Sequence, residues 1–461
     1  MINEKNKDVL SIHVDAPIID EKNKDVICAA PWSHLYMDTG GLVRPCCTHD
    51  IVYGDSNTTS IKDIWNSSEI IKFRKNLLAG VKQEGCKFCY QQEKHTGQSL
   101  RTGLNDKYGN LMSRNPTPDM VIKYLDIRSS NLCNMACIMC GSEYSSLWHD
   151  DEVKLYEQAH ISGKFINITK ETEKDIIENI LSNNIDLVYF AGGEPLITPY
   201  HYELLEKLIS MGISNDINLR YNTNLSTLKY KKIDLAERWS HFKSVEIAAS
   251  IDMIGERAEL HRYGTDWKKI SNHLRTVRFD IPSVSLTPQI TVTALSIGYL
   301  SELLTYFIDE LGFTEDDYIN VNIALWPEKL NPQLLPKSIK ELYTNKLQSF
   351  LDNTDMKKLC KSGVMMAMNS MNEVDKSDKF EDMIDYLNQL DDIRPTNWKV
   401  LWPEIAEKTS EKTEAPKETI KEAPKEKAKF REFYVPGGAG SNFLVSKCLW
   451  AGDESQEFNP Y

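Results

Sequence analysis

Three cysteines, Cys133, Cys137 and Cys140, stand at C-x3-C-x2-C spacing directly after an apolar run, Val121–Ile127, that predicts a buried strand. Thiolates this close cannot bridge one another without strain, but they can wrap one loop around a soft metal centre. Three thiolates leave one iron of a [4Fe–4S] cube open, and an open iron can bind a small molecule and pass it an electron. A zinc site is the alternative, but the nearest histidine, His149, lies nine residues further on. The spacing favours an iron–sulfur centre over zinc.

A second group of cysteines lies nearer the N-terminus. Short apolar runs on both sides of Asp38–Gly41 predict a β-hairpin with cysteines at its outer ends, and a helical pattern over 61–78 then leads to a C-x2-C pair. The four candidate ligands are Cys28, Cys46, Cys86 and Cys89. Four thiolates assembled in this way suit a metal cluster, and the spacing alone also suits a zinc ribbon. Cys47 is adjacent to Cys46 and could replace it as a ligand.

The elements that would position these groups alternate between strand and helix from about residue 120 to 325. This alternation is typical of β/α units with a parallel sheet. The predicted strands are Val121–Ile127, Ile185–Phe190, Ile217–Asn222, Val245–Ser250, Gln289–Ala294 and Ile319–Leu325. Amphipathic helices are predicted between them, for example over 202–209 and 300–311. Six strands are fewer than the eight of a closed (β/α)8 barrel.

Polar groups follow the ends of several predicted strands, where parallel sheets place their active sites. Strand two ends in Gly192, Gly193, Glu194 and Pro195, where glycines permit close backbone approach and a carboxylate could meet an ammonium group. Strand three ends at Asn222, and strand four leads through Ser250 and Asp252 to Arg262. Each motif alone is equally consistent with an ordinary turn or helix cap. Together they predict a ligand site at one edge of the sheet.

The three-cysteine loop resembles the cluster loop of radical S-adenosylmethionine (SAM) enzymes, with Met139 where the family usually has an aromatic residue. The resemblance implies that Cys133, Cys137 and Cys140 hold a [4Fe–4S] cluster that binds SAM, within an α/β domain built as a six-stranded partial barrel. It also implies that the Gly-Gly-Glu-Pro motif holds the SAM amino group. By the same resemblance, Ser250 and Asp252 contact the ribose, Arg262 contacts the carboxylate, and Asn222 belongs to the cofactor site.

The N-terminal cysteines resemble the twitch domain, the shortened form of the SPASM domain that holds auxiliary [4Fe–4S] clusters. The resemblance implies that Cys28, Cys46, Cys86 and Cys89 ligate one auxiliary cluster without an open iron. The full SPASM pattern has two further cysteines after the C-x2-C pair, and His95 and Ser99 occupy that stretch here. This domain usually follows the radical SAM domain, whereas here it precedes it.

The rest of the chain divides by composition. We expect a disordered N-terminus over 1–25, the twitch domain over 26–100, the partial barrel over 101–335 and a helical extension over 336–403. Apolar residues nearly vanish over 404–429, which predicts a charged, disordered linker, and 430–461 form a tail rich in aromatic residues and glycine. We expect the tail to pack near the open end of the sheet, or to recruit a partner.

Composition narrows the function classes. The formal charge of −13 and a pI of about 5.4 argue against a general nucleic-acid or anionic-membrane binder. Residues 1–7 lack the apolar core of a signal peptide, and no run approaches the ~18 apolar residues of a membrane span. We therefore expect a cytoplasmic protein, whose ten cysteines are metal ligands rather than disulfide partners.

The resemblance implies a radical SAM oxidoreductase or maturase. Such an enzyme cleaves SAM reductively to a 5′-deoxyadenosyl radical, which abstracts a hydrogen atom so that the substrate is oxidised or cross-linked. A peptide or protein substrate is the first expectation, and a small alcohol of the aminocyclitol type is the alternative. The implied electron donor is a flavodoxin- or ferredoxin-like protein. The contrasting hypothesis is a non-catalytic iron–sulfur or zinc protein that carries electrons or binds a partner.

Overall fold

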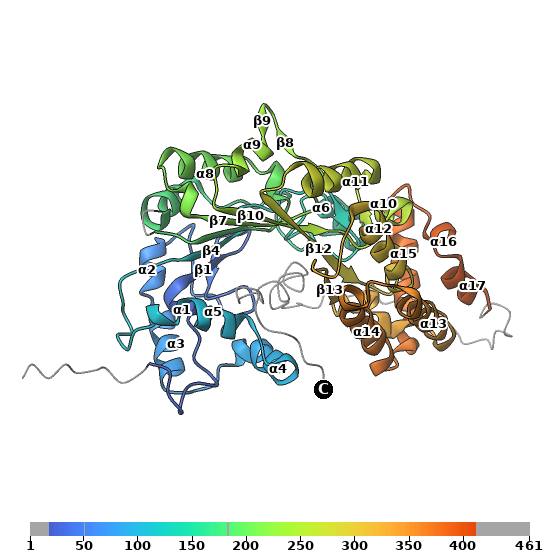
Figure 1. Cartoon of the computed structure of the whole chain (residues 1–461), viewed down its shortest axis with the longest axis horizontal. Helices are drawn as coiled ribbons and strands as arrows, with labels where there is room; N and C mark the ends of the chain where they lie inside the picture. The colour runs from blue at the N-terminus through green and yellow to red at the C-terminus, as the bar shows by residue number, and fades with distance from the viewer. Residues whose placement is uncertain (1–17, 50, 182–183, 412–461) are drawn as a thin grey trace, which may run out of the picture.

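The computed structural model describes residues 18–49, 51–181 and 184–411, and Figure 1 shows the arrangement of its elements. A nine-stranded sheet forms the centre, with the strand order β13-β12-β10-β7-β6-β4-β1-β2-β3. Its strands are β1 (His34–Met37), β2 (Leu42–Arg44), β3 (Gly54–Asp55), β4 (Tyr124–Ile127), β6 (Leu187–Phe190), β7 (Asn218–Thr223), β10 (Ser244–Ser250), β12 (Val284–Val292) and β13 (Asn320–Ile323). The six predicted strands all occur in this sheet, and neighbours from β1 to β13 pair in parallel.

The sheet is wider than the six strands expected from the sequence because the N-terminal segment joins it. Strand β1 pairs in parallel with β4, from His34 opposite Tyr124 to Met37 opposite Ile127. It also pairs antiparallel with β2, and β2 pairs with β3. The edge of β4 that a lone barrel domain would expose is therefore hydrogen-bonded to the N-terminal segment.

The N-terminal helices gather around the β1 end of the sheet (Figure 1). They are α1 (Ala30–Ser33), α2 (Ile61–Trp65), α3 (Ser68–Leu78), α4 (Lys87–Thr96) and α5 (Leu100–Tyr108). The helical pattern predicted over 61–78 is two helices, because the Ser67 hydroxyl accepts a hydrogen bond from the Ile70 N–H and starts α3 anew. The Ser99 hydroxyl caps α5 in the same way, by accepting from the Thr102 N–H.

Helices that connect the strands cover one face of the sheet. Figure 1 shows α8, α9 and α11 in a row above it. Their bounds are α6 (Trp148–Tyr156), α7 (Lys170–Asp175), α8 (Pro199–Ser210), α9 (Leu235–Trp239), α10 (Gly255–His261), α11 (Trp267–Arg275) and α12 (Leu300–Leu311). Strand β7 shows how the two faces differ. Leu219, Tyr221 and Thr223 are buried, whereas the alternate residues are partly exposed. Of these, Arg220 pairs with Glu246 of β10 at 2.6 Å.

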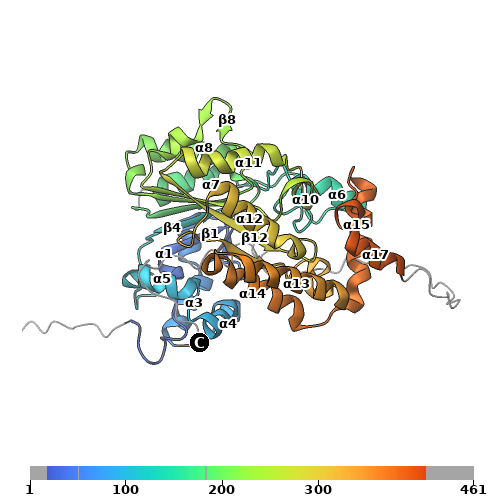
Figure 2. The ribbon, with the colours of Figure 1, turned by 45° about the vertical axis from the view of Figure 1, so that its right-hand side comes forward.

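The C-terminal helices gather at the other end of the sheet, where α14 packs against β13 (Figure 1) and α13 lies beside α14 (Figure 2). They are α13 (Lys337–Asn353), α14 (Lys357–Glu373), α15 (Phe380–Ile393), α16 (Trp398–Leu401) and α17 (Pro403–Glu411). The linker predicted from residue 404 is wrong over its first eight residues, which belong to α17. Glu404 accepts hydrogen bonds from the hydroxyls of Tyr299 and Tyr343, and Ile405 is fully buried, so tertiary contacts hold a segment whose composition predicts disorder.

The ends of the chain bear on two other expectations. Residues 18–25, predicted as disordered, contain a turn in which Asn23 is fully buried and donates to the Ile18 carbonyl. The rest of the predicted linker, beyond residue 411, and the tail over 430–461 lie outside the described residues. Within residues 18–411 as described, no helix combines the length and the apolar character needed to span a bilayer.

Candidate active site

The three-cysteine loop follows β4 and is held by a small sheet of its own. Strand β5 (Ala136–Cys137) pairs antiparallel with β11 (Arg262–Tyr263), so that Cys137 stands opposite Arg262. The Trp148 indole N–H donates to the Cys137 carbonyl at 2.7 Å, and the Cys140 N–H donates to the same oxygen at 2.9 Å. Cys133, Cys137 and Cys140 line one pocket with about 710 Å³ of open space. The structure thus brings the three predicted thiols together.

The electrostatics of these thiols suit a cationic metal centre. Cys137 is buried, and Cys133 and Cys140 are half-buried. Burial raises the pKa of all three thiols, and the neighbouring thiolates raise the pKa of Cys133 and Cys140 further. Arg262 opposes this effect at Cys137, 3.7 Å from its sulfur. Three thiolates can share this pocket only if a positive centre compensates their charge, which an iron–sulfur cluster does.

The glycines after β6 allow the chain to pass directly against the cysteine loop. A Cβ on Gly193 would lie 2.3 Å from the Leu132 carbonyl oxygen, and Gly192 has φ +108°. The Gly193 N–H donates to the Ser130 carbonyl at 3.0 Å, and the Glu194 N–H donates to that of Leu132 at 2.7 Å. Both glycines line the pocket. Their first structural role is therefore to fasten the end of β6 to the start of the cysteine loop.

Glu194 lines the same pocket and is almost fully buried. Its carboxylate accepts hydrogen bonds from the Leu196 N–H (2.9 Å), the Thr223 hydroxyl (2.6 Å) and the Asn224 N–H (2.7 Å). Burial raises its pKa to about 7, although these donors act in the opposite direction. Pro195 begins a buried 3-10 turn, Pro195–Ile197, immediately behind the carboxylate.

Asn222 and Ser250, at the ends of β7 and β10, also line the pocket. The Asn222 side-chain oxygen is buried and has no hydrogen-bond partner among the described residues. A buried acceptor without a donor is costly in a folded protein, so this atom is suited to receive a hydrogen bond from a ligand.

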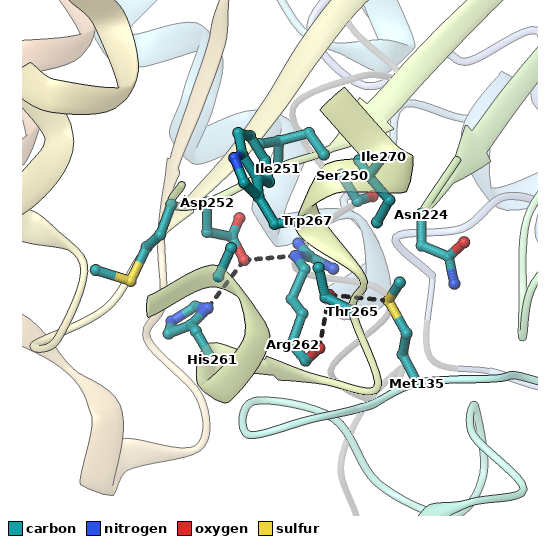
Figure 3. Close-up of a pocket in the computed structure, with 12 residues that line it drawn as sticks. Met135, Asn224, Ser250, Ile251, Asp252, His261, Arg262, Thr265, Trp267 and Ile270 are labelled. Carbon is teal, nitrogen blue, oxygen red and sulfur yellow. Dashed lines mark hydrogen bonds and ion pairs between the residues drawn. The ribbon is translucent and has the colours of Figure 1, made fainter. Parts of the chain in front are cut away.

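Arg262 is positioned by a buried carboxylate (Figure 3). Its Nε lies 2.8 Å from Asp252 Oδ2, and the same oxygen lies 3.2 Å from His261 Nδ1. The other oxygen, Oδ1, accepts the Thr291 N–H at 2.7 Å. Asp252 is only 2% exposed and does not line the large pocket, which Arg262 does. In this arrangement Asp252 orients Arg262, whereas the sequence resemblance placed it on the ribose.

A smaller pocket lies behind Arg262, and Figure 3 shows the side chains around it. Met135 and Trp267 contribute to its lining, and the Thr265 hydroxyl lies 3.5 Å from the Met135 sulfur. Residues of the cysteine loop and of the segment after β10 both line this smaller pocket.

Two site residues, Arg128 and Tyr144, were missed in the sequence. They line the large pocket together with Asn224, from the Asn222-Thr-Asn224 run that ends strand three, and the Asn224 side-chain amide donates to Asn134 Oδ1, inside the cysteine loop, at 2.9 Å. Arg128 directly follows the predicted first strand, so its place at a strand end was a usable signal. Tyr144 had no such signal in the sequence, because its position in the pocket depends on how the loop after Cys140 folds.

The N-terminal cysteines form a second cluster of thiols. Cys28, Cys46 and Cys89 are buried and Cys86 is half-buried. Burial raises the pKa of Cys46, and the charges of Cys47, Cys89, Cys28 and Cys86 raise it further. Cys47 also acts on Cys89, so both Cys46 and Cys47 stay candidates for the fourth ligand. In the described part of the chain, no group of three or more His, Cys, Asp or Glu side chains is arranged to hold a single metal ion.

Fold and site together define an α/β protein with a three-thiol pocket at the carboxyl ends of parallel strands and a second thiol cluster beside it. Family models match both parts. Residues 127–288 match the radical SAM superfamily, and residues 28–90 match the SPASM iron–sulfur cluster-binding domain. Within this chain the SPASM match therefore precedes the radical SAM match.

Solved structures show distant likeness. Streptococcus suis SuiB bound to S-adenosylmethionine is 14% identical, with a TM-score of 0.34, over 62% of this chain and 64% of SuiB. Native anSMEcpe with bound AdoMet is 22% identical, with a TM-score of 0.33, over 50% of this chain and 62% of anSMEcpe. The chain therefore spans less than two thirds of the length of these two proteins. No curated protein matches the chain.

The two family models imply the cofactors: a [4Fe–4S] cluster with SAM for the radical SAM domain, and auxiliary iron–sulfur for the SPASM domain. The residues present fit these groups. The large pocket combines three thiols with the unpartnered Asn222 oxygen, and the N-terminal cluster supplies four further thiols.

Proposed function

We propose that this chain is a radical SAM enzyme that oxidises or cross-links a peptide or protein substrate. The observation that carries the proposal is the convergence of three thiols, the Gly-Gly-Glu turn and Arg262 on one pocket at the carboxyl ends of parallel strands. When bound there, the cluster and SAM would supply a 5′-deoxyadenosyl radical, by reductive cleavage of SAM, to abstract hydrogen from the substrate.

The protein's own groups would bind and orient SAM. Cys133, Cys137 and Cys140 would hold the cluster, and Arg262 would bind the SAM carboxylate, because a guanidinium beside the thiols is already oriented by Asp252. Glu194 has three internal donors, so it would reach the SAM ammonium through its remaining acceptor capacity.

The backbone of Gly192 and Gly193 would form one wall of the SAM site, together with Ser250. Asn222 would accept a hydrogen bond from SAM through its unpartnered oxygen. SAM and substrate bound in this pocket would displace water from the reacting atoms.

The N-terminal cysteines would hold one auxiliary cluster through Cys28, Cys46, Cys86 and Cys89. Strand β1 supports this arrangement, because it joins the SPASM domain to the first strand of the radical SAM domain in one sheet. An auxiliary centre beside the pocket would accept an electron from the substrate or help to position it. A flavodoxin- or ferredoxin-like protein would supply the electron that starts the reaction.

The peptide substrate follows from the resemblance to SPASM-type maturases, and a small alcohol is the second candidate. The test is to reconstitute the full chain anaerobically and incubate it with SAM and dithionite. We expect 5′-deoxyadenosine from the wild type and none from a variant with Cys133, Cys137 and Cys140 changed to Ala. A wild type that holds iron but forms no 5′-deoxyadenosine would show a non-catalytic iron–sulfur protein.

The substrate class needs a second measurement. A peptide mixture and an aminocyclitol mixture are each added, and the products are analysed by mass spectrometry for a loss of two hydrogens that depends on SAM. Modification confined to the aminocyclitols would replace the peptide proposal with the alcohol dehydrogenase.

A further inference from the structure

Arg128 stands at the point where the two domains meet, directly after β4. Its N–H donates to the carbonyl of Met37 in β1 at 3.0 Å, and its guanidinium lies over the Tyr36 ring, 4.2 Å from the centroid. Gly192 passes so close that a Cβ there would lie 2.8 Å from the Arg128 Cβ. Arg128 is thus held by the SPASM strand on one side and the end of β6 on the other.

The Arg128 guanidinium is buried, and its two terminal nitrogens make no hydrogen bond to the described residues. The side chain is 1% exposed, and its Nη2 forms an ion pair with Asp126 Oδ1 at 3.4 Å, with Asp126 itself fully buried. Neither oxygen of Asp126 has a hydrogen-bond partner among the described residues either, so the ion pair compensates the charge without satisfying the donors. Buried donors that make no hydrogen bond are unfavourable. Because Arg128 lines the large pocket, an acceptor on a ligand bound there would satisfy them.

The shape of the group indicates what that acceptor is. Two terminal nitrogens in one plane match the two oxygens of a carboxylate, whereas a carboxamide offers one acceptor. Arg44 of β2 lies over the same Tyr36 ring, with its Cζ 5.8 Å from the centroid, and is paired with Asp38 at 3.5 Å. Arg262 lies beside Cys137 in the same pocket and is already assigned to SAM, which leaves Arg128 for a different ligand.

We propose that Arg128 binds a carboxylate of the substrate, with Tyr36 and Asp126 as the residues that position its guanidinium. This inference rests on the proposed function, because the pocket must take a substrate together with SAM. The carboxylate belongs to an acidic side chain of a peptide or to a small organic acid.

Three probes separate these sources: the capped peptide acetyl-Ala-Glu-Ala-amide, its Gln counterpart, and glutarate. Binding to the reconstituted full chain with SAM is measured by anaerobic calorimetry. We expect an acid probe to bind about 10- to 100-fold more tightly than the Gln peptide, the range for a charge-assisted hydrogen bond. Preference for the Glu peptide indicates a peptide acid, and binding of glutarate alone indicates a small acid. If neither acid binds more tightly than the Gln peptide, the inference is wrong.

The variants are Arg128→Gln and the double change Asp126→Asn with Arg128→Gln, which avoids an uncompensated buried carboxylate. Arg278→Gln is the matched control, because Arg278 pairs with Asp317 outside the pocket. We expect both Arg128 variants to lose the acid preference and to keep the iron content and the SAM affinity. A fall in SAM affinity would instead assign Arg128 to SAM and overturn the inference. Absence of 5′-deoxyadenosine from the wild type would refute the proposed function separately.

Discussion

At the scale of single residues, the site depends on charged side chains whose orientation is determined by neighbouring residues. Asp252 holds Arg262 beside Cys137, and three donors hold Glu194 in the wall of the pocket. The two ionisable groups assigned to SAM are therefore oriented before it binds. Such preorganisation lowers the entropic cost of binding.

Arg262→Gln tests this assignment. Loss of a charge-assisted hydrogen bond of about 1.5–3 kcal/mol predicts SAM binding weaker by roughly 10- to 100-fold, with unchanged iron content. SAM affinity is measured by equilibrium dialysis of the reconstituted protein, and iron by colorimetric assay. Asp252→Asn should weaken binding in the same direction through the loss of orientation. Equal SAM affinity in wild type and Arg262→Gln would remove Arg262 from the SAM site.

At the scale of elements, the turn after β6 and the cysteine loop form one unit. A side chain on Gly193 would meet the backbone of Leu132, which cannot move without moving the loop that carries Cys133. The position of the thiols is therefore tied to the absence of a single Cβ.

Gly193→Ala should lose the iron of the pocket cluster, which is about half of the total if the two clusters are comparable. Gly103→Ala is the matched control, because Gly103 lies in α5 and a Cβ there would meet nothing within 4 Å. Iron content after reconstitution compares the two variants. Full iron content in Gly193→Ala would show that the loop adapts to the added methyl group.

Helix α8 contributes a pH dependence to the fold. His201 is 1% exposed, packs against Phe190 and lies 2.9 Å from the Tyr221 hydroxyl, and burial lowers its pKa to about 3 from the ordinary 6.5. Below pH 6.5 His201 is protonated in the unfolded chain but stays neutral in the folded chain until the pH approaches 3. Stability due to this residue is therefore complete above the unfolded pKa and is lost as the pH falls from 6.5 towards 3.

Between pH 7.5 and 5.5 this loss is about 1.4 kcal/mol, and His201→Phe should remove it. The free energy of unfolding by urea is measured at both pH values for the wild type and the variant. His34, whose pKa burial also lowers to about 3, remains in both proteins and keeps its own contribution. Identical pH dependence in the two proteins would show that His201 titrates normally in the folded state.

At the scale of the whole molecule, the segments that match the two family models meet in one sheet while their cysteines form two sets. Strand β1, within the SPASM match, pairs with β4, which ends where the radical SAM match begins, and Arg128 follows β4 directly. The shared sheet fixes the direction of one thiol set relative to the other. Electron transfer between their clusters and simultaneous contact with one substrate both require such a fixed arrangement.

If the two cysteine sets hold separate clusters, removing either set should remove only its own share of the iron. Changing Cys133, Cys137 and Cys140 to Ala should remove about half of the iron and all SAM cleavage, because one of two comparable clusters is lost. Changing Cys28, Cys46, Cys86 and Cys89 should remove the other half. Iron is assayed in both variants after identical reconstitution. Loss of nearly all iron from either variant would point to one site shared by both sets.

The sequence by itself indicated the candidate ligands of this protein and six of its parallel strands. Cysteine spacing favours an iron–sulfur loop over a zinc site, because ligands close in the chain are close in any fold, and the alternation of apolar runs predicted the six strands that the sheet contains. The turn chemistry at Gly192–Pro195 was readable for the same local reason.

Only the tertiary structure decided which distant groups meet. Asp252 forms an ion pair with Arg262, Arg128 lines the pocket beside Asp126, and β1 extends the sheet beyond six strands. Helix α17 formed within a segment whose composition predicted a linker, because Tyr299 and Tyr343 hold Glu404. Side-chain partners far apart in sequence have no local signature, since they are selected by packing and by the need to pair every buried charge.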